Sequence, residues 1–176
     1  MAGHNKWSKI KHKKAATDAA KSKVFGKMAR LIAVESKKAN GDTSAPGLRA
    51  AIDSAKAISM PKDNIERAVA KGTSDETAAL ESILYEMYGP SGTAVLIDIL
   101  TDNRNRTAAE IRHLLSRLGY ELATPGSAVW AFTKTAEGYD ANSTVEISDE
   151  DGEKLEKLME ALDEHDDVQD VYTNAA

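Results

Sequence analysis

The first twenty residues, MAGHNKWSKIKHKKAATDAA, gather the side chains best suited to holding a polyanion. Five lysines, two histidines and a tryptophan occur among the first fourteen positions, with no acidic residue between them. Lysines neutralise phosphates and release their counterions, and an indole ring can stack on an exposed base. The alternative is a solvated basic tail without a partner. We favour a nucleic-acid-binding arm made of Lys6, Trp7, Lys9, Lys11, His12, Lys13 and Lys14.

The next segment extends this basic character with a helical period. Its expected apolar face consists of Val24, Phe25, Met28, Leu31 and Ile32. On the opposite side, the same period gives a basic stripe of Lys23, Lys27, Arg30 and Lys37. Because the arm runs directly into this helix, we add Lys23, Lys27 and Arg30 to the predicted nucleic-acid site.

A second candidate site is the stretch TDNRNRT at residues 101–107. Arg104 and Arg106 come just before a predicted helix, where the helix dipole disfavours cations. Two arginines beside free backbone N–H groups can hold a phosphate or a nucleic-acid backbone. The alternative, which the sequence leaves open, is that these arginines pair with Asp98 or Asp102.

Residues 48–71 allow a helix-turn-helix interpretation. A short turn leads into a helix that carries Lys62, Asn64, Arg67 and Lys71. Such side chains read base edges when they lie at a helix N-terminus in the major groove. Two short helices around a proline-containing turn are also typical of an ordinary bundle, so both interpretations stand.

Charge is strongly segregated along the chain, although the formal total is only -5. Residues 1–78 hold 16 basic and 8 acidic side chains, whereas residues 135–176 hold 2 basic and 14 acidic ones. Charges are screened over about 8 Å at physiological salt, so a distant acidic end does not cancel the basic arm. We expect the basic part to meet a polyanion and the acidic end to repel it.

Other functional classes find little support in the sequence. The chain lacks cysteine, and no Ser/His/Asp set or metal-ligand cluster emerges, so we expect no enzyme, no cofactor and no metal site. One enzymatic alternative is chemistry on nucleic acid through Asp98 and Asp102 with magnesium. No apolar run approaches the roughly 20 residues of a membrane span. We expect a cytoplasmic protein with a nucleic-acid partner, and neither a membrane nor a small-molecule substrate as a partner.

The order of the periodic segments predicts an α+β fold with two domains, residues 1–78 and 79–176. The first is a basic three-helix domain, whose first helix ends near Asn40-Gly41 and whose later helices start at Pro46 and Pro61. In the second domain, strands are expected at residues 82–89, 93–100, 127–134, 143–148 and 168–173.

Two helices interrupt these strands. The first follows a T-x-x-E capping box at Thr107 and Glu110, and the second is the acidic helix that contains Leu155 and Leu162. From residue 93 onward the order is strand–helix–strand–strand–helix–strand. This order predicts a ferredoxin-like split βαβ domain with one extra strand in front.

Four long motifs carry a family resemblance, in order over nearly the whole chain. They are MAGHNKWSKIKHKKAATDAAKSKVFGKMARLI, MPKDNIERAVAKG, YEMYGPSGTAVLIDILTDNRNRTAAEIRH and DDVQDVYTNA, and they resemble the YebC/PmpR family. The resemblance implies a helical N-terminal domain followed by ferredoxin-like α/β modules. It also implies a nucleic-acid face from Lys6 through Arg30 and no catalytic residue. Bacterial members are described as DNA-binding transcriptional regulators, and a mitochondrial relative as an activator of translation.

The chain departs from the family pattern in one place. Typical members carry a further α/β module after the strand at 127–134, where this chain has only TAEGYDAN. We expect a short form that closes by itself. The predicted function is that of a nucleic-acid-binding regulator of gene expression, as a DNA-binding transcriptional regulator. The alternative is a ribosome-associated translation factor that binds ribosomal RNA by shape and charge.

Overall fold

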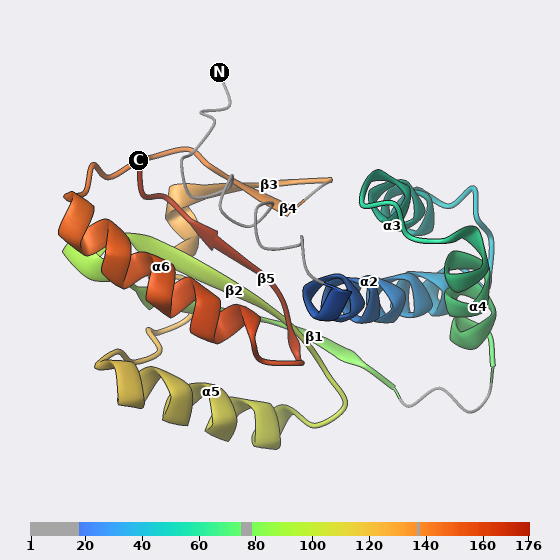
Figure 1. The fold of residues 1–176 in the computed structure, drawn as a ribbon, viewed down its shortest axis with the longest axis horizontal. Coiled ribbons are helices and arrows are strands. Elements are labelled where there is room, and N and C mark those ends of the chain that lie inside the picture. The colour runs from blue at the N-terminus through green and yellow to red at the C-terminus, as the bar shows by residue number, and fades with distance from the viewer. Residues whose placement is uncertain (1–17, 75–78, 137) are drawn as a thin grey trace. The chain divides into compact units, whose positions relative to one another are not determined.

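The computed structural model describes residues 18–74, 79–136 and 138–176, which form helices and antiparallel sheets (Figure 1). The predicted α+β class is confirmed. The described chain consists of two compact units, a helical unit that ends at Leu80 and an α/β unit that begins at Glu81.

The helical unit contains α2 (Asp18–Lys38), α3 (Pro46–Ala57) and α4 (Lys62–Gly72). The end of α2 lies just before the predicted stop at Asn40-Gly41, and α3 and α4 begin at or next to the predicted prolines. After α2 the backbone turns through Asn40 and Gly41, both with positive φ. Pro46 is the first residue of α3, and Pro61 is the N-cap of α4. Proline suits these positions because a helix start has no partner for its backbone N–H.

The three helices enclose a small apolar core. Ile32 of α2, Leu48 of α3 and Ile65 of α4 are buried in it. Each comes from the apolar face that its helix presents at a 3.6-residue period.

The helices α2 and α4 approach each other closely at Gly72. A Cβ at this position would stand 2.3 Å from the carbonyl oxygen of Ala33 and 2.6 Å from Cβ of Ser36. Ser36 is fully buried, and its hydroxyl donates a hydrogen bond to the carbonyl of Val69 at 2.7 Å. A side chain at Gly72 would therefore push the two helices apart.

The α/β unit is built on a three-stranded antiparallel sheet in the order β1-β2-β5. Its strands are β1 (Glu81–Tyr88), β2 (Ala94–Thr101) and β5 (Val168–Thr173). A short 3₁₀ turn at Pro90–Gly92 joins β1 to β2. Seven of the eight residues of the central strand β2 are buried, because both faces of the sheet are covered.

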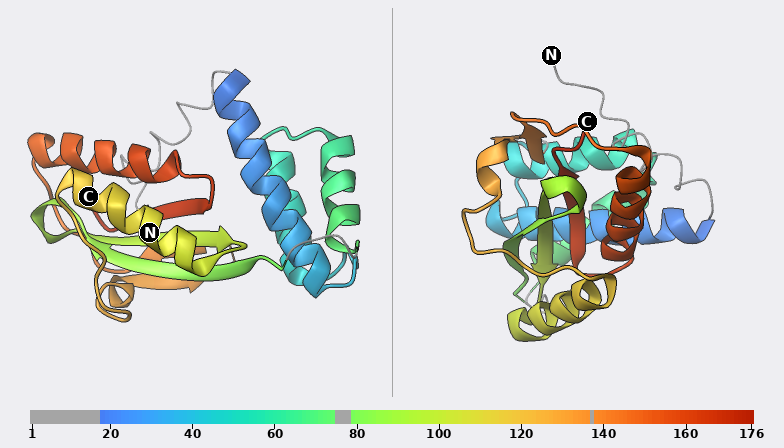
Figure 2. Two further views of the ribbon diagram at one scale, coloured as in Figure 1. Left: turned by 90° about the horizontal axis from the view of Figure 1, so that it is seen from below. Right: turned by 90° about the vertical axis from the view of Figure 1, so that its left-hand side faces the viewer.

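Two layers cover the sheet (Figure 2). The helices α5 (Arg104–Leu118) and α6 (Asp149–Asp163) pack on one face, and a hairpin of β3 (Phe132–Thr135) and β4 (Gly138–Ala141) packs on the other. Successive residues of β2 point alternately into two apolar cores, one under the helices and one under the hairpin. Ile97 lies among Ile111 and Leu155 of the helices, whereas Leu96 lies against Phe132 of the hairpin.

The predicted order strand–helix–strand–strand–helix–strand is present as β2, α5, β3, β4, α6 and β5, but β3 and β4 form a separate sheet. β2 and β5 pair antiparallel. The other edge of β2 is taken by β1, the extra strand of the prediction. Because β1 fills that edge, β3 and β4 pair only with each other and close the opposite face.

Two of the expected strands are wrong in extent or place. Residues 143–148 form no strand; only Val145 makes an isolated parallel bridge, to Ala175. The fourth strand is instead Gly138–Ala141, within the stretch read as a loop, where Tyr139 packs edge-on against Tyr172 at 5.4 Å between ring centroids. The strand expected at 127–134 begins only at Phe132, because Val129–Ala131 form a 3₁₀ turn.

Candidate nucleic-acid interface

The basic arm of the prediction, Lys6 to Lys14, lies outside the described residues. Its role therefore stays a prediction. The part of the predicted site that the structure describes is on α2, where Lys23, Lys27 and Arg30 are half-buried. Spacings of four and three residues place these cations on one side of the helix.

Arg30 also lines a groove of about 430 Å³ between α2 and α4. The apolar part of the lining comes mainly from Phe25, Ala29 and Ala33 of α2, with Met60 and Ala68. Arg67 and Lys71, one helical turn apart on α4, line it from the other side. None of the described residues that line the groove is acidic.

The groove brings together residues from two separate predictions, the basic stripe and the helix-turn-helix interpretation. Arg30 belonged to the basic stripe, whereas Arg67 and Lys71 belonged to the helix-turn-helix interpretation. The sequence predicts which side chains share one face of each helix. It does not predict which faces of α2 and α4 pack against each other. Packing between helices is a tertiary property, and this sequence has no motif that signals it.

The first residues of α4 interact mainly with their own helix. Lys62 forms an ion pair with Glu66 at 3.5 Å. The guanidinium of Arg67 donates to the backbone carbonyl of Asp63 at 3.3 Å and to the side-chain oxygen of Asn64. Base readout by this helix stays a prediction. Lys62 and Arg67 are already held by groups of their own helix.

The second candidate site lies at the start of α5. The capping prediction there is wrong: Asn103, not Thr107, is the N-cap, and its side chain accepts a hydrogen bond from the backbone N–H of Arg106 at 3.1 Å. Thr107 lies within α5 and is buried, and its hydroxyl bonds to Thr101 and to Asp167, each at 2.7 Å.

Both arginines of this site contact carboxylates. Arg104 pairs with Glu81 on β1 at 2.6 Å, with both side chains exposed. Arg106 pairs with Asp102 at 3.1 Å, as the alternative interpretation anticipated, and also with Asp167 at 2.7 Å. A role of these arginines in anion binding stays a prediction, since in this structure each guanidinium has an acidic partner.

The surroundings of Arg106 form the one group of potential metal ligands among the described residues. Side-chain atoms of Glu110, His165 and Asp167 lie within 4.8 Å of one another. The hydrogen bond and charge of Asp167, together with Asp102 and Glu110, raise the pKa of Arg106 above its ordinary value. The guanidinium of Arg106 contacts both Asp167 and Glu110, so it places a positive charge beside these two carboxylates.

The sequence analysis missed an exposed aromatic pair in the α/β unit. Tyr88 and Trp130 are 39% and 59% exposed. The hydroxyl of Tyr88 and the indole N–H of Trp130 both donate to the carbonyl of Ser127, the indole at 2.8 Å. Trp130 belongs to the stretch SAVWAF and Tyr88 to the strand expected at 82–89, and both stretches have the pattern of a strand rather than of an exposed aromatic site.

A buried carboxylate fixes the loop beside this pair. Glu86 on β1 is 6% exposed and accepts N–H bonds from Gly126, Ala128 and Val129 at 2.6–2.8 Å. Burial by itself raises the pKa of Glu86, but these three donors outweigh it and hold the pKa below its usual range.

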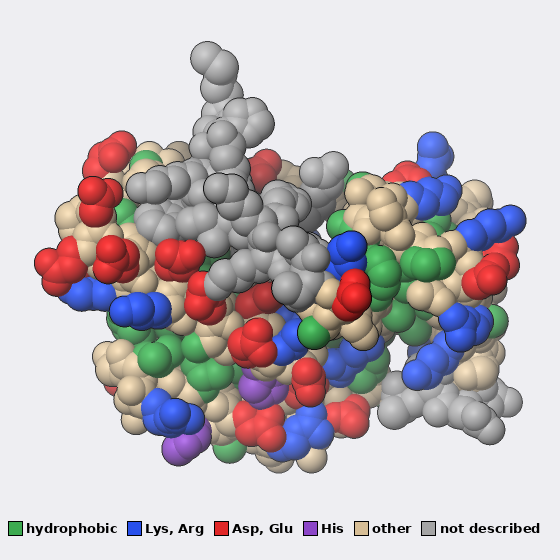
Figure 3. Space-filling model, viewed as in Figure 1, with side chains coloured by type: hydrophobic (Ala, Val, Ile, Leu, Met, Phe, Trp, Pro, Cys, Tyr) green, Lys and Arg blue, Asp and Glu red, His purple; other side chains and the backbone are tan. Residues whose placement is uncertain are grey.

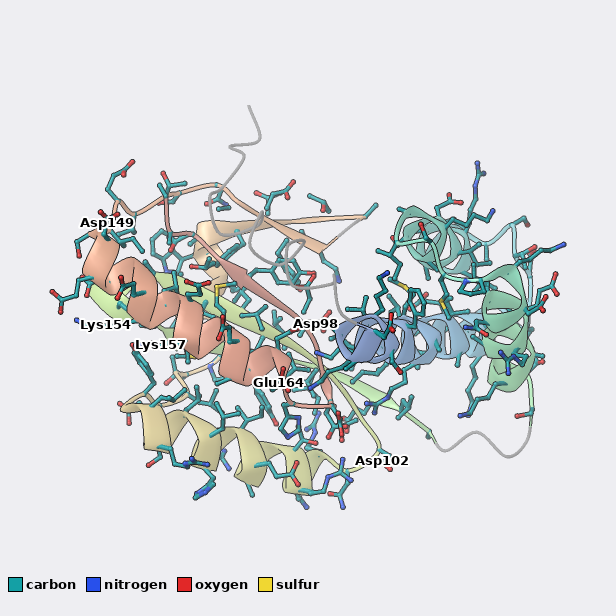
Figure 4. All side chains as sticks on the ribbon, viewed as in Figure 1. Asp98, Asp102, Asp149, Lys154, Lys157 and Glu164 are labelled. Atoms are coloured by element: carbon teal, nitrogen blue, oxygen red, sulfur yellow. The ribbon has the colours of Figure 1, made fainter. Side chains whose placement is uncertain are left out.

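The surface of α6 has the opposite charge from that of α2. Figure 3 shows acidic side chains gathered over this helix, and Figure 4 shows Asp149 and Glu164 at its two ends. Lys154 lies between acids and pairs with Glu150 at 2.9 Å and Asp151 at 3.2 Å. No helix in the described part of the chain is long and apolar enough to cross a membrane.

Comparison with known proteins gives a consistent result along the chain. Residues 5–75 match the TACO1/YebC protein N-terminal domain, and residues 80–137 and 134–175 match the TACO1/YebC second and third domain. The two segments of the second match overlap at residues 134–137, beside the stretch where the sequence is expected to depart from the family pattern.

Relatives of this chain include a protein of Desulfatibacillum aliphaticivorans named "Probable transcriptional regulatory protein". It is 38% identical over 237 aligned residues, which cover 99% of this chain and 96% of the relative. A protein of the same name from Francisella tularensis subsp. novicida (strain U112) is 46% identical over 182 residues, covering 99% and 71% of the two chains.

A solved structure has the same fold. The crystal structure of the conserved hypothetical protein Aq1575 from Aquifex aeolicus matches with a TM-score of 0.77 and 29% identity, over 90% of this chain and 91% of that one. Family domains that match nearly the whole length, and relatives that align with 99% of it, lead to one conclusion. The chain belongs to the TACO1/YebC family, and its relatives from Desulfatibacillum aliphaticivorans and Francisella tularensis are each named "Probable transcriptional regulatory protein".

Proposed function

We propose that this protein is a nucleic-acid-binding regulator of gene expression, and that it acts as a DNA-binding transcriptional regulator. The cationic surface of the helical unit carries the proposal. Lys23, Lys27 and Arg30 follow one side of α2, and Arg67 and Lys71 of α4 border the same groove as Arg30. A surface of this kind holds a phosphate backbone by charge. The names of the relatives support a regulatory role.

The α/β unit has a different part in this proposal. The first turn of α6 alone carries Asp149, Glu150 and Asp151. A surface with this charge repels a phosphate backbone, so the helical unit is the contacting face. The α/β unit then orients the helical unit or contacts another protein.

A second candidate function is that of a translation factor bound to ribosomal RNA. The hydrogen bonds of Arg67 to its own helix and the ion pair of Lys62 with Glu66 favour it. Side chains held in this way suit recognition by charge and shape better than hydrogen bonding to base edges in a major groove.

The protein acts by binding, in the cytoplasm, and requires neither catalysis nor a cofactor in this proposal. The carboxylates of the enzymatic alternative, Asp98 and Asp102, support this choice. Asp98 lies within β2, opposite Asp170 of β5, whereas Asp102 follows the end of β2 (Figure 4). Asp102 pairs with Arg106 at 3.1 Å. A shared magnesium ion requires two carboxylates that are directed at one point. Asp98 and Asp102 instead face different neighbours, Asp170 and Arg106, which favours binding over catalysis.

Crosslinking in living cells, followed by sequencing of the bound nucleic acid, tests the proposal. One variant replaces Lys9, Lys11, Lys13 and Lys14 by glutamine, and a second makes the changes Lys23→Gln and Lys27→Gln. The matched control, Lys154→Gln with Lys157→Gln, removes the same number of charges as the second variant, but from the acidic helix.

Enriched promoter DNA that both basic variants lose, and that the control retains, is the expected result. Ribosomal RNA enriched and lost in the same way would replace the transcriptional proposal by the translational one. Absence of enriched nucleic acid from the wild-type protein would overturn both.

A further inference from the structure

The groove between α2 and α4 is lined by both apolar and cationic side chains. Its lining includes an aromatic ring and small aliphatic side chains, with the cations Arg30, Arg67 and Lys71 among them. Its volume of about 430 Å³ falls in the range of roughly 300–1,000 Å³ that is typical of small-molecule sites. An apolar surface bordered by positive charge is complementary to a ligand that is flat and apolar at one end and anionic at the other.

Gly26 is a second feature of the groove that bears on what it binds. It lies inside α2, where glycine is destabilising relative to alanine. Yet, apart from its chain neighbours and the nearby backbone of α2, a Cβ at Gly26 would meet no heavy atom of the described chain within 4 Å. Packing within the described part therefore does not require glycine here. Glycine does let a ligand approach the helix backbone, and Gly26 lines the groove.

Three cations of the basic stripe indicate which ligand would reach the groove. Lys23, Lys27 and Arg30 extend over about 10 Å of helix axis and end at the groove, which Arg30 lines. A polyanionic backbone that follows the stripe is led to the groove opening. The aromatic ring of Phe25 and the guanidinium planes of Arg30 and Arg67 are groups on which bases stack.

We propose that the groove between α2 and α4 binds one unpaired nucleotide of a nucleic-acid strand. Its base lies against Phe25, Gly26 and Ala29, and its phosphates contact Arg30, Arg67 and Lys71. Asn64 also lines the groove; its side-chain oxygen accepts from Arg67, and its amide NH₂ is the group that donates to a base edge in this proposal. This inference rests on the proposed function, and it adds that the helical unit prefers single-stranded or unpaired segments to a closed duplex.

The test uses the full chain and two probes, a short fluorescent single-stranded RNA of mixed sequence and a duplex made from the same strand. The variant Gly26→Leu fills the groove from an open position, and Ala57→Leu on the exposed end of α3 is the matched control. Arg67→Gln removes a cation of the groove, and Arg49→Gln removes one from an exposed position that does not line it. Circular dichroism checks that each variant folds.

Gly26→Leu should weaken single-strand binding by about ten-fold and leave duplex binding nearly unchanged. Arg67→Gln should weaken single-strand binding more than Arg49→Gln does. Equal losses for both probes, or none for the single strand, would overturn the inference while the proposed function stands. Failure of the wild-type chain to bind the single strand would overturn the inference, whereas the proposed function is decided separately by the crosslinking of promoter DNA. Binding of an acidic amphipathic peptide that is lost in Gly26→Leu, with RNA binding retained, would assign the groove to a protein partner instead.

Discussion

Arg106 of α5 donates a hydrogen bond to the carboxylate of Asp167 at 2.7 Å, across 61 residues of sequence. Asp167 precedes β5 and is 5% exposed. The hydroxyl of Thr107 donates to the same carboxylate oxygen, also at 2.7 Å. These two bonds join the start of α5 to the segment that leads into β5, so the stretch TDNRNRT has a structural task whatever it binds.

Removal of this carboxylate should destabilise the protein. In Asp167→Ala the buried hydroxyl of Thr107 loses an acceptor and Arg106 loses its closest acidic partner. We expect the free energy of unfolding to fall by about 2–4 kcal/mol, measured by urea denaturation. Asp166→Ala, at the exposed neighbouring position, is the control and should change it by less than about 0.5 kcal/mol. Equal effects of the two substitutions would contradict a structural role for Asp167.

Arg104 offers a cleaner test of anion binding than Arg106. Its pair with Glu81 is exposed on both sides, and such pairs contribute about 0–1 kcal/mol. Arg104→Gln should therefore leave the melting temperature nearly unchanged. If the start of α5 holds a phosphate, the affinity for a duplex should still fall in a fluorescence-anisotropy titration. Unchanged affinity would remove Arg104 from the nucleic-acid site.

Glu86 should make the stability of the α/β unit depend on pH. Its folded pKa is lowered, so its stabilisation is present above its ordinary pKa of 4.5 and is lost as pH falls through the folded value. In Glu86→Gln the amide NH₂ competes with the N–H donors of Gly126, Ala128 and Val129. We expect a loss of about 2 kcal/mol at pH 7 and a smaller loss at pH 3, measured by urea denaturation at both values. Glu121→Gln, at an exposed position, is the control; the same loss at both pH values would contradict this account.

Much of the fold was predictable because its signals are local. Pro46, Pro61 and the Asn40-Gly41 turn fix the helix boundaries through backbone geometry alone. The strands β1 and β2 are apolar segments around the turn at Pro90–Gly92, and they lie within one residue of their predicted ends. Such features depend on residues close in sequence, so a sequence can show them.

The errors concern features that depend on distant residues. Val145 and Ile147 alternate as in a strand, yet the hydrogen bonds at Val145 go to Asn174 and Ala176 beside a single bridge. Thr107 resembles an N-cap in the sequence, but its hydroxyl is hydrogen-bonded to Thr101 and Asp167 inside the α/β unit. The groove depends in the same way on the packing of α2 against α4.

Two helix glycines should respond oppositely to alanine. A Cβ at Gly72 would lie 2.3 Å from the carbonyl oxygen of Ala33, so Gly72→Ala must displace α4 from α2 and should cost about 1–3 kcal/mol. Gly26 has open space, so Gly26→Ala should gain about 0.5–1 kcal/mol from helix propensity alone. Thermal melts followed by circular dichroism measure both. A loss of stability in Gly26→Ala would mean that Gly26 serves the fold.

Salt dependence provides the most direct test of the basic face. If six cations of the arm and of α2 contact phosphates of duplex DNA, the logarithm of the association constant should fall with the logarithm of salt concentration at a slope of about -5. Replacing Lys23, Lys27 and Arg30 by glutamine removes three of these contacts, so the slope should become shallower by about 0.9 for each. Lys154→Gln with Lys157→Gln on the acidic α6 should leave the slope as it is. Anisotropy titrations over a series of salt concentrations measure it, and a flat response of the wild-type protein would show that its partner is not held by phosphate charge.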